Sequence, residues 1–209
     1  MYVFLLGRPG CGKSAIYRMV IEKLKVKGVG KEYPRVDDFP KLWAIFQNDE
    51  KTGQWQRCKK TSDGGYKVTD DSVWDEILRQ VNDDLLKFNP SEGTRSEVTF
   101  VEFSRSDYLG ALKNFSKSVL NNSVIVYIDC SFDVCWARNV ERHKNALAAG
   151  TDDHLVSREE MEKTYLYDDR DKLTQLKQYK IIVIKNEQNG YEHLKEPVEK
   201  LVEIILSQK

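Results

Sequence analysis

One short stretch near the N-terminus constrains the fold more than any other part of the chain. Residues 7–14 read GRPGCGKS and directly follow the apolar run YVFLL at residues 2–6. Closely spaced glycines let a backbone turn sharply with its amide groups pointing inward, and a helix that begins behind them adds its positive end. The spacing fits G-x-x-x-x-G-K-[ST], in which such a loop wraps a phosphate chain. The stretch therefore predicts a buried strand, a phosphate-binding loop and a helix, in that order.

The motif predicts a role for the residues of the loop. Lys13 is expected to bridge the outer phosphates of a nucleotide, and the Ser14 hydroxyl is expected to contact a magnesium ion. The backbone around them is expected to hold the phosphates, through residues Gly7, Gly10, Cys11, Gly12, Lys13, Ser14 and Ala15. The sequence thus predicts ATP and Mg²⁺ as ligands. A glycine turn that binds nothing is the alternative.

The rest of the chain alternates between helical and strand patterns. Apolar residues recur at helical spacing over 13–27, 71–88, 108–120, 132–148 and 191–207, and 41–46 begins another helix or turn. Short apolar runs typical of buried strands occupy 98–103, 124–128 and 181–184. This alternation predicts an α/β fold of three layers, α/β/α, with a mostly five-stranded parallel sheet. Ligands in such sheets bind beyond the carboxyl ends of the strands.

The whole chain, residues 1–209, is expected to form a single domain. Its least regular part is residues 47–68, within an acceptor-side segment at about 47–70, where the sequence is polar and lacks sustained periodicity. We expect this segment to be the most mobile. Ser157 and Glu160, three apart, form a capping box and predict that a helix starts there.

The composition argues against several other classes of protein. The 33 basic and 33 acidic residues cancel, so nucleic acid is not an expected partner. No apolar run is long enough to cross a membrane, and residues 2–6 resemble a strand rather than a signal peptide. The four cysteines show no zinc spacing and predict reduced thiols. We expect a cytoplasmic protein, either a monomer or a homodimer.

With its loop, length and strand order, the sequence resembles the P-loop small-molecule kinases, which include nucleoside, nucleotide and sugar-acid kinases. The layout covers nearly the whole chain, but a few short motifs carry the resemblance. The first is VDDFP at residues 36–40. Nucleoside-type members, such as uridine and nicotinamide riboside kinases, have Asp-Asp-Phe here, and one aspartate acts as the base for the acceptor hydroxyl. The resemblance implies this role for Asp37 or Asp38, with Asp37 preferred; Asp38 could instead cap a helix.

The second motif is FVEFSR at residues 100–105. An acid at the end of a buried strand is the usual place for a carboxylate that holds magnesium through water, which implies this role for Glu102. In nucleotide kinases an arginine three residues after the acid holds the phosphate of the acceptor, which implies that role for Arg105. An exposed salt bridge is the alternative.

The third motif is YIDCSFDVCWARNVER at residues 127–142. It resembles the fourth strand of the family and the helix that enters its lid, with Ser131 as the helix cap. Arg138 and Arg142 share a helix face and are implied to contact the nucleotide base and phosphates, although two solvated arginines would show the same spacing. A lid then follows at about 143–158.

Three further side chains belong to this hypothesis. Arg158 or Arg170 could reach the site when the lid closes, and the sequence does not choose between them. Trp43 lies beside the acceptor-side segment and could stack on a ring of the acceptor.

The resemblance therefore implies an ATP- and Mg²⁺-dependent phosphotransferase with a small-molecule acceptor. The Asp-Asp-Phe motif favours a nucleoside-like acceptor, whereas Arg105 favours a phosphorylated one. One alternative is a nucleotide-binding ATPase or regulatory protein without such an acceptor. The other is a polynucleotide 5′-kinase, which the zero net charge disfavours.

Overall fold

A five-stranded, fully parallel sheet forms the centre of the molecule. The computed structural model describes residues 1–87, 98–150 and 155–208. In this sheet the strand order is β2-β5-β1-β6-β7, so the strand that carries the glycine loop lies in the middle. The strands are β1 (Tyr2–Leu6), β2 (Arg35–Asp37), β5 (Thr99–Phe103), β6 (Ser123–Asp129) and β7 (Lys180–Lys185). The predicted sheet is confirmed.

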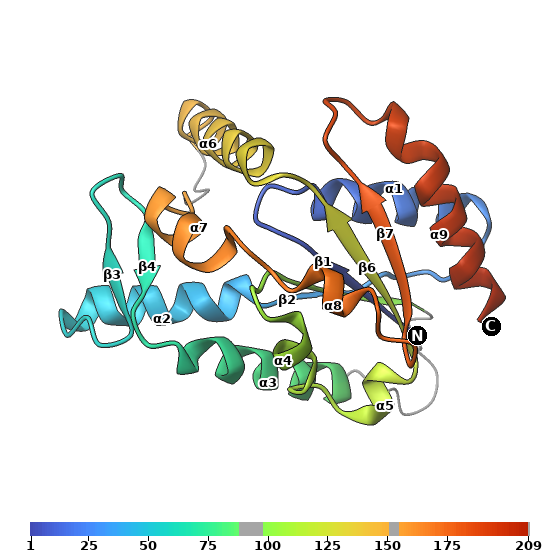
Figure 1. Ribbon diagram of the computed structural model, residues 1–209, viewed down its shortest axis with the longest axis horizontal. Helices are drawn as coiled ribbons and strands as arrows, with labels where there is room; N and C mark the ends of the chain where they lie inside the picture. Colours follow the sequence, from blue (N-terminus) through green and yellow to red (C-terminus); the bar gives the residue numbers. More distant parts are fainter. Residues whose placement is uncertain (88–97, 151–154, 209) are drawn as a thin grey trace.

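The apolar run of β1 is continuous because both faces of the sheet are covered. Val3 and Leu5 pack into one core, beneath α1 (Lys13–Val26) and α9 (Lys195–Ser207). Successive strand residues point to opposite faces. Phe4 and Leu6 accordingly pack into a second core, whose helices are α3 (Ser72–Lys87), α4 (Tyr108–Leu112) and α5 (Lys117–Leu120). Figure 1 shows these two helical layers on either side of the sheet, which confirms the three-layer architecture.

A smaller lobe stands beyond the sheet, at the side where α2 (Phe39–Thr52) lies (Figure 1). The antiparallel hairpin of β3 (Cys58–Lys60) and β4 (Tyr66–Val68) packs with α2 and the start of α3 around a third apolar cluster. The helix α7 (Arg158–Tyr165) packs on β4, and α6 (Phe132–Ala148) packs on α7.

This lobe corrects the expectation of an irregular segment at 47–70. Its first residues complete α2, and the rest form the hairpin. The buried carboxylate of Asp49 organises the connection, since it accepts hydrogen bonds from the backbone amides of Arg57 (2.7 Å) and Cys58 (3.0 Å). A polar residue that accepts hydrogen bonds from buried backbone amides produces no periodic apolar pattern in the sequence.

Other helices differ from the predictions at their ends. The stretch 108–120 forms two short helices, α4 and α5, instead of one. A 3₁₀ turn, η1 (Glu192–Leu194), precedes α9, and the short helix α8 (Arg170–Leu173) was not predicted. Part of the expected lid, residues 143–148, belongs to α6, while 151–154 lie outside the described residues. Among the described helices, none has both the length and the apolar character that a membrane crossing requires.

Candidate active site

The glycine loop lies between the carboxyl end of β1 and the start of α1, as predicted. Gly12 is the N-cap of α1 and has a φ of 104°, in the left-handed region that favours glycine. A Cβ atom at Gly12 would lie 2.3 Å from Nδ2 of Asn186. That same Nδ2 atom donates a hydrogen bond of 2.7 Å to the carbonyl oxygen of Cys11. The loop is therefore fixed in shape by direct contact with the residue that follows β7.

The side chain of Lys13 folds back into the loop. Its Nζ atom donates to the carbonyl oxygens of Gly7 (2.9 Å) and Arg8 (3.0 Å) and to the Ser104 hydroxyl (2.9 Å). Burial alone would lower the pKa of Lys13, but nearby negative charge, including that of Glu102, outweighs burial and raises the pKa. The ammonium group is thus charged and held where the phosphates of a nucleotide would enter the loop.

Two carboxylates stand at neighbouring strand ends beside the loop. Asp37 of β2 is paired in register with Glu102 of β5, so both reach the same edge of the sheet. Arg35 lies between them, 2.9 Å from Asp37 and 2.7 Å from Oε2 of Glu102. This oxygen of Glu102 is buried, and Arg35 does not meet it with hydrogen-bond geometry. Burial raises the pKa of Glu102, and Lys13 partly offsets that effect.

A third carboxylate, Asp38, forms a buried ion pair with Arg105. The Arg105 Nη1 atom lies 2.7 Å from Oδ2 of Asp38, and its guanidinium packs 4.7 Å from the ring centre of Trp74. Burial raises the pKa of Asp38 to about 6; Arg105 opposes this shift, and the charge of Asp37 adds to it. The pKa of the Asp38 carboxyl group is therefore closer to neutral pH than that of an exposed aspartate.

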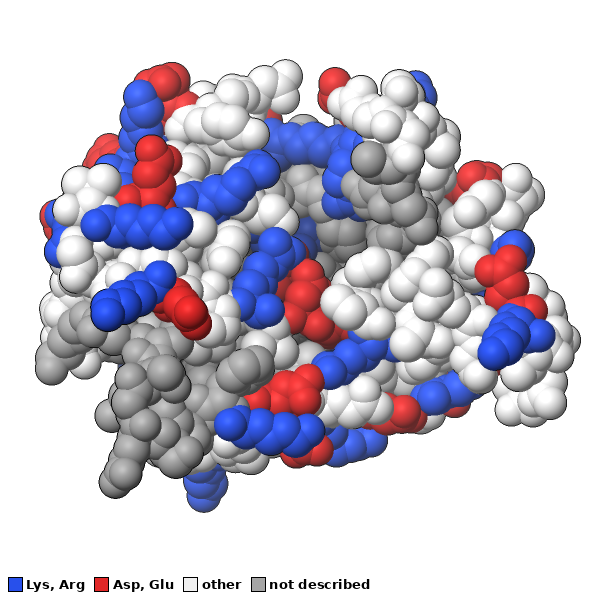
Figure 2. All heavy atoms as spheres, turned by 180° about the vertical axis from the view of Figure 1, so that it is seen from behind, with Lys and Arg blue, Asp and Glu red and all other residues white. Residues whose placement is uncertain are grey.

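These groups meet in one cavity of about 490 Å³, a volume typical of a small-molecule site. Most of the residues that the sequence indicated line it, namely Gly10, Gly12, Lys13, Ser14, Ala15, Asp37, Asp38, Glu102, Arg138 and Arg142. On the face shown in Figure 2, Lys and Arg side chains gather across the upper middle of the molecule, next to a small group of Asp and Glu side chains.

Four of the indicated residues do not belong to the cavity lining. Gly7 and Cys11 shape the loop through their carbonyl oxygens, which accept from Lys13 and Asn186. Arg105 lies behind Asp38, and Trp43 packs edge-on against the ring of Tyr66 at a centroid distance of 5.5 Å.

Two arginines of α6 line the cavity. Arg138 donates to the carbonyl oxygens of Asn186 (2.9 Å) and Gln188 (2.7 Å), which follow β7. Arg142 donates to Oδ1 of Asn139 at 3.2 Å. Ser131 begins α6, but its hydroxyl bonds Glu187 at 2.8 Å instead of capping the helix.

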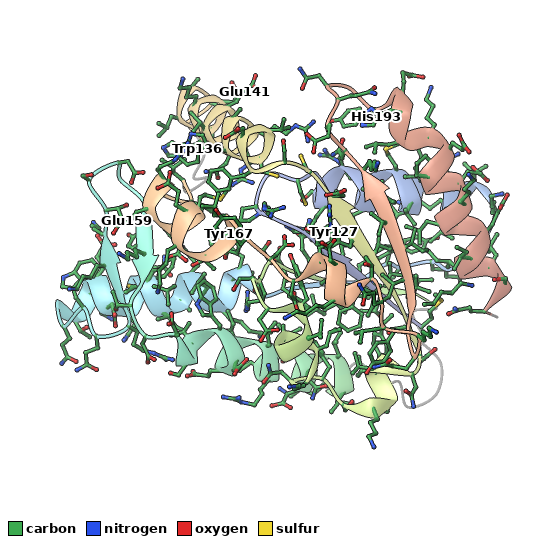
Figure 3. The ribbon with its side chains drawn as sticks, viewed as in Figure 1. Tyr127, Trp136, Glu141, Glu159, Tyr167 and His193 are labelled. Atoms are coloured by element: carbon green, nitrogen blue, oxygen red, sulfur yellow. The ribbon has the colours of Figure 1, made fainter. Side chains whose placement is uncertain are left out.

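The two arginines that could enter from the lid side have other partners. Arg158 packs over the ring of Trp136, 5.2 Å from its centre, where α6 faces α7 (Figure 3). Arg170 pairs with Asp129 at 2.8 Å. Neither lines the cavity as described.

Sequence reasoning missed several residues of the site. Asn186 directly follows a strand, so the rule that ligands bind at strand ends could have indicated it. Arg18 lies four residues after Ser14 and shares its helix face, and it lines the cavity. Ser104 carried no recognisable signal, and Glu160 was predicted only as half of a capping box, because the roles of both in the cavity depend on contacts between distant segments.

The comparisons with known proteins agree with this geometry. No family model matches the sequence, and the search of curated proteins gives no significant match. Solved structures do match. Shikimate kinase from Acinetobacter baumannii, in complex with shikimate, is 16% identical with a TM-score of 0.51, and the match covers 100% of this chain and 94% of that one. APS kinase from Mycobacterium tuberculosis, in complex with AMPPNP and APS, is 13% identical with a TM-score of 0.52, over 99% and 96% of the two chains.

A gluconokinase from Sinorhizobium meliloti 1021 is similar to the same degree. It is 12% identical with a TM-score of 0.51, and the match covers 100% of this chain and 97% of that one. At these identities the matches establish the fold and leave the reaction open. The sheet order, the loop at its centre and these structural matches together show that the chain has the fold of the P-loop small-molecule kinases.

Proposed function

We propose that this protein is an ATP- and Mg²⁺-dependent phosphotransferase that acts on a hydroxyl group of a small-molecule acceptor. The observation that supports this most is the single cavity that contains both Lys13, at the phosphate-binding loop, and the carboxylate of Asp38. A kinase needs this combination, because the γ-phosphate and the acceptor hydroxyl must meet in line beside a group that can accept a proton.

The loop and its surroundings suit the triphosphate. The loop amides and Lys13 would hold the β- and γ-phosphates, and the arginines of α6 add positive charge at the edge of the cavity. Arg138 and Arg142 would face the nucleotide from this side.

The residues present also fit a magnesium ion. The Ser14 hydroxyl lines the cavity, and the buried Oε2 atom of Glu102 is an acceptor without a hydrogen-bond donor among the described residues. Ser14 would contact the ion directly, and Glu102 would hold it through water. When bound, the ion neutralises charge on the phosphates. No group of three His, Cys, Asp or Glu side chains suited to a metal occurs in the described ranges, so the phosphates and water would complete the shell.

We assign the base to Asp38 in preference to Asp37. Each oxygen of Asp37 already accepts one hydrogen bond, from the amide of Phe39 (3.0 Å) and from Arg35 (2.9 Å), which leaves Asp37 with fewer free lone pairs than Asp38. Arg105 holds one oxygen of Asp38, which orients the other for the acceptor. The acceptor oxygen would attack the γ-phosphorus while its proton passes to Asp38, and the bond to the β-phosphate oxygen would break to release ADP.

The proposal is tested by transfer of label from γ-³²P-ATP to a metabolite panel. Lys13→Ala should lower transfer by at least about 100-fold, because the ammonium group at the phosphates is lost. Lys25→Ala, an exposed lysine of the same helix, is the matched control and should leave transfer unchanged. Full transfer by Lys13→Ala would refute the assignment.

The base is tested by two neighbouring substitutions. Asp38→Asn should keep ATP binding and lose transfer, whereas Asp37→Asn should retain most of it. Normal transfer by both variants would exclude these aspartates. Phosphate release without a labelled acceptor, in the unmodified protein, would favour a nucleotide-binding ATPase.

A further inference from the structure

The acceptor end of the cavity has walls that differ from those around the loop. They come from α2, β4, α7 and the residues next to them, and the side chains that face the cavity are mostly apolar or aromatic. They include Leu42, Phe46, Tyr66, Val68 and Tyr165. The rings of Phe46 and Tyr66 are stacked, with centroids 4.7 Å apart and planes 8° from parallel. Walls of this kind favour a flat and largely apolar ligand.

No lysine or arginine of these walls faces the cavity among the residues that the structure describes. The smaller lobe of α2, β3, β4 and α7, here called the acceptor lobe, has basic side chains that pair with acids instead. Lys67 pairs with Glu159, Lys163 lies 2.9 Å from Asp71, and Arg57 lies 2.5 Å from Glu76. A phosphate or carboxylate group of an acceptor would therefore meet no charge partner on these walls, because the basic side chains that do line the cavity, such as Arg35 and Arg142, come from other elements.

Arg105, the residue that indicated a phosphorylated acceptor, is also held by contacts within the protein. Its guanidinium donates to Asp38 and to the carbonyl oxygens of Ser104 (2.6 Å) and Trp74 (3.1 Å), and it is buried. Its contacts position the carboxylate of Asp38. These contacts favour the acceptor that the Asp-Asp-Phe motif indicates over the one that Arg105 indicates.

One buried acid does face the acceptor end. Glu160 of α7 lines the cavity and is only 4% exposed. Its Oε2 atom accepts from the amide of Val68 at 2.8 Å, and its Oε1 atom accepts from the Thr164 hydroxyl. Each carboxylate oxygen has two lone pairs, so both retain the capacity to accept from a ligand.

From these contacts we propose that the acceptor is an alcohol without a phosphate or carboxylate group, whose flat ring lies against Phe46 and Tyr66 and donates a hydrogen bond to Glu160. This inference rests on the proposed kinase function and specifies its substrate class. The acid repels anions from this end of the cavity, while the aromatic walls bind the ring.

The experiment compares adenosine, guanosine, cytidine and uridine with their 5′-monophosphates and with gluconate, using γ-³²P-ATP. We expect at least one nucleoside to be labelled with a kcat/KM at least about tenfold above that of its monophosphate and of gluconate. A higher kcat/KM for a monophosphate or for gluconate would overturn the inference and leave the kinase function standing. ATP binding that depends on Lys13, without transfer to any nucleoside, would overturn it too. Absence of ATP binding would instead refute the proposed function.

Two substitutions test the assigned contacts. Glu160→Gln should raise the KM for the preferred nucleoside about tenfold, as expected for a lost hydrogen bond to a charged group, and should leave AMPPNP affinity unchanged. Glu159→Gln is the matched control: Glu159 lies on the hairpin side of α7, is more than half exposed and pairs with Lys67 (Figure 3).

Phe46→Leu removes a ring while keeping an apolar side chain. It should also raise the KM for the nucleoside without changing AMPPNP affinity. An unchanged KM in both Glu160→Gln and Phe46→Leu would show that the acceptor binds elsewhere.

Discussion

Asp38 and Arg105 form an ion pair, and we expect the two residues to have different roles. Arg105 is fixed by Asp38, by two carbonyl oxygens and by the Trp74 ring. A guanidinium held on several sides is a rigid support, in contrast to a flexible cation that waits for a ligand. The same contacts keep the carboxylate of Asp38 at the cavity wall with a fixed orientation. If Asp38 is the base, as we propose, Arg105 is a positioning residue that acts through it.

This pair predicts how activity depends on pH. Burial raises the pKa of Asp38 to about 6, and only the ionised carboxylate can accept a proton. The kcat/KM should therefore rise as the pH increases through about 6. Since Arg105 favours the ionised form, Arg105→Gln should shift this rise to higher pH.

The measurement is kcat/KM between pH 4.5 and 8.5. Arg57→Gln, an arginine that directly precedes β3 and pairs with Glu76, is the control and should leave the pH profile unchanged. If Arg105 only bound a phosphate of the acceptor, its substitution would raise KM and leave the pH of the rise unchanged, which would contradict the positioning role.

At the scale of elements, the central sheet could be predicted because its signals are local. The run at residues 2–6 is apolar throughout since Val3 and Phe4 enter opposite cores, and that burial can be inferred from the sequence alone. The glycine loop that follows this run could be predicted equally well, because its glycines and lysine are close together in the sequence. The strand and the loop can both be predicted from residues that are neighbours in the sequence.

The acceptor lobe could not be predicted, because its strands and its contacts are short or distant in sequence. The strands β3 and β4 have three residues each, too few for an alternating pattern. Glu160 was interpreted as half of a capping box, yet its carboxylate accepts from Val68, 92 residues away. The role of such a residue depends on which segments meet in the fold.

The two serines predicted as helix caps behave differently, which yields a test at this scale. The Ser157 hydroxyl accepts from the amide of Glu160 (3.1 Å) at the start of α7, as predicted, and also donates to the Tyr66 carbonyl oxygen (3.3 Å). Ser157→Ala should therefore lower the free energy of unfolding by about 1–2 kcal/mol. Ser131→Ala should cost less, because Ser131 makes no cap and its contact with Glu187 is exposed. Denaturant titration of both variants decides; equal losses would contradict the difference in capping.

Considered as a whole, the molecule has cores of unequal size. Two large apolar cores sandwich the sheet, whereas the acceptor lobe relies on a small cluster that includes Phe46, Tyr66 and Val68. The helix α7 adds polar contacts to this lobe through Glu160 and Ser157. A lobe with few buried apolar contacts and short strands is expected to open at a lower free energy than the sheet.

Hydrogen exchange should reveal this difference. Amides of β4 and α7 should exchange faster than those of β1 and β6 in the free protein, because the lobe can open while both large cores remain packed. AMPPNP with Mg²⁺ should slow exchange in the glycine loop, whereas an acceptor should slow it in β4, where it would contact Tyr66 and Val68. Exchange measured by mass spectrometry on the free, AMPPNP-bound and doubly bound protein separates the two effects. If β4 were as protected as β1 without ligand, the lobe would be part of the same cooperative unit as the sheet. The acceptor would then enter a preformed cavity, and its binding would require no opening of the lobe.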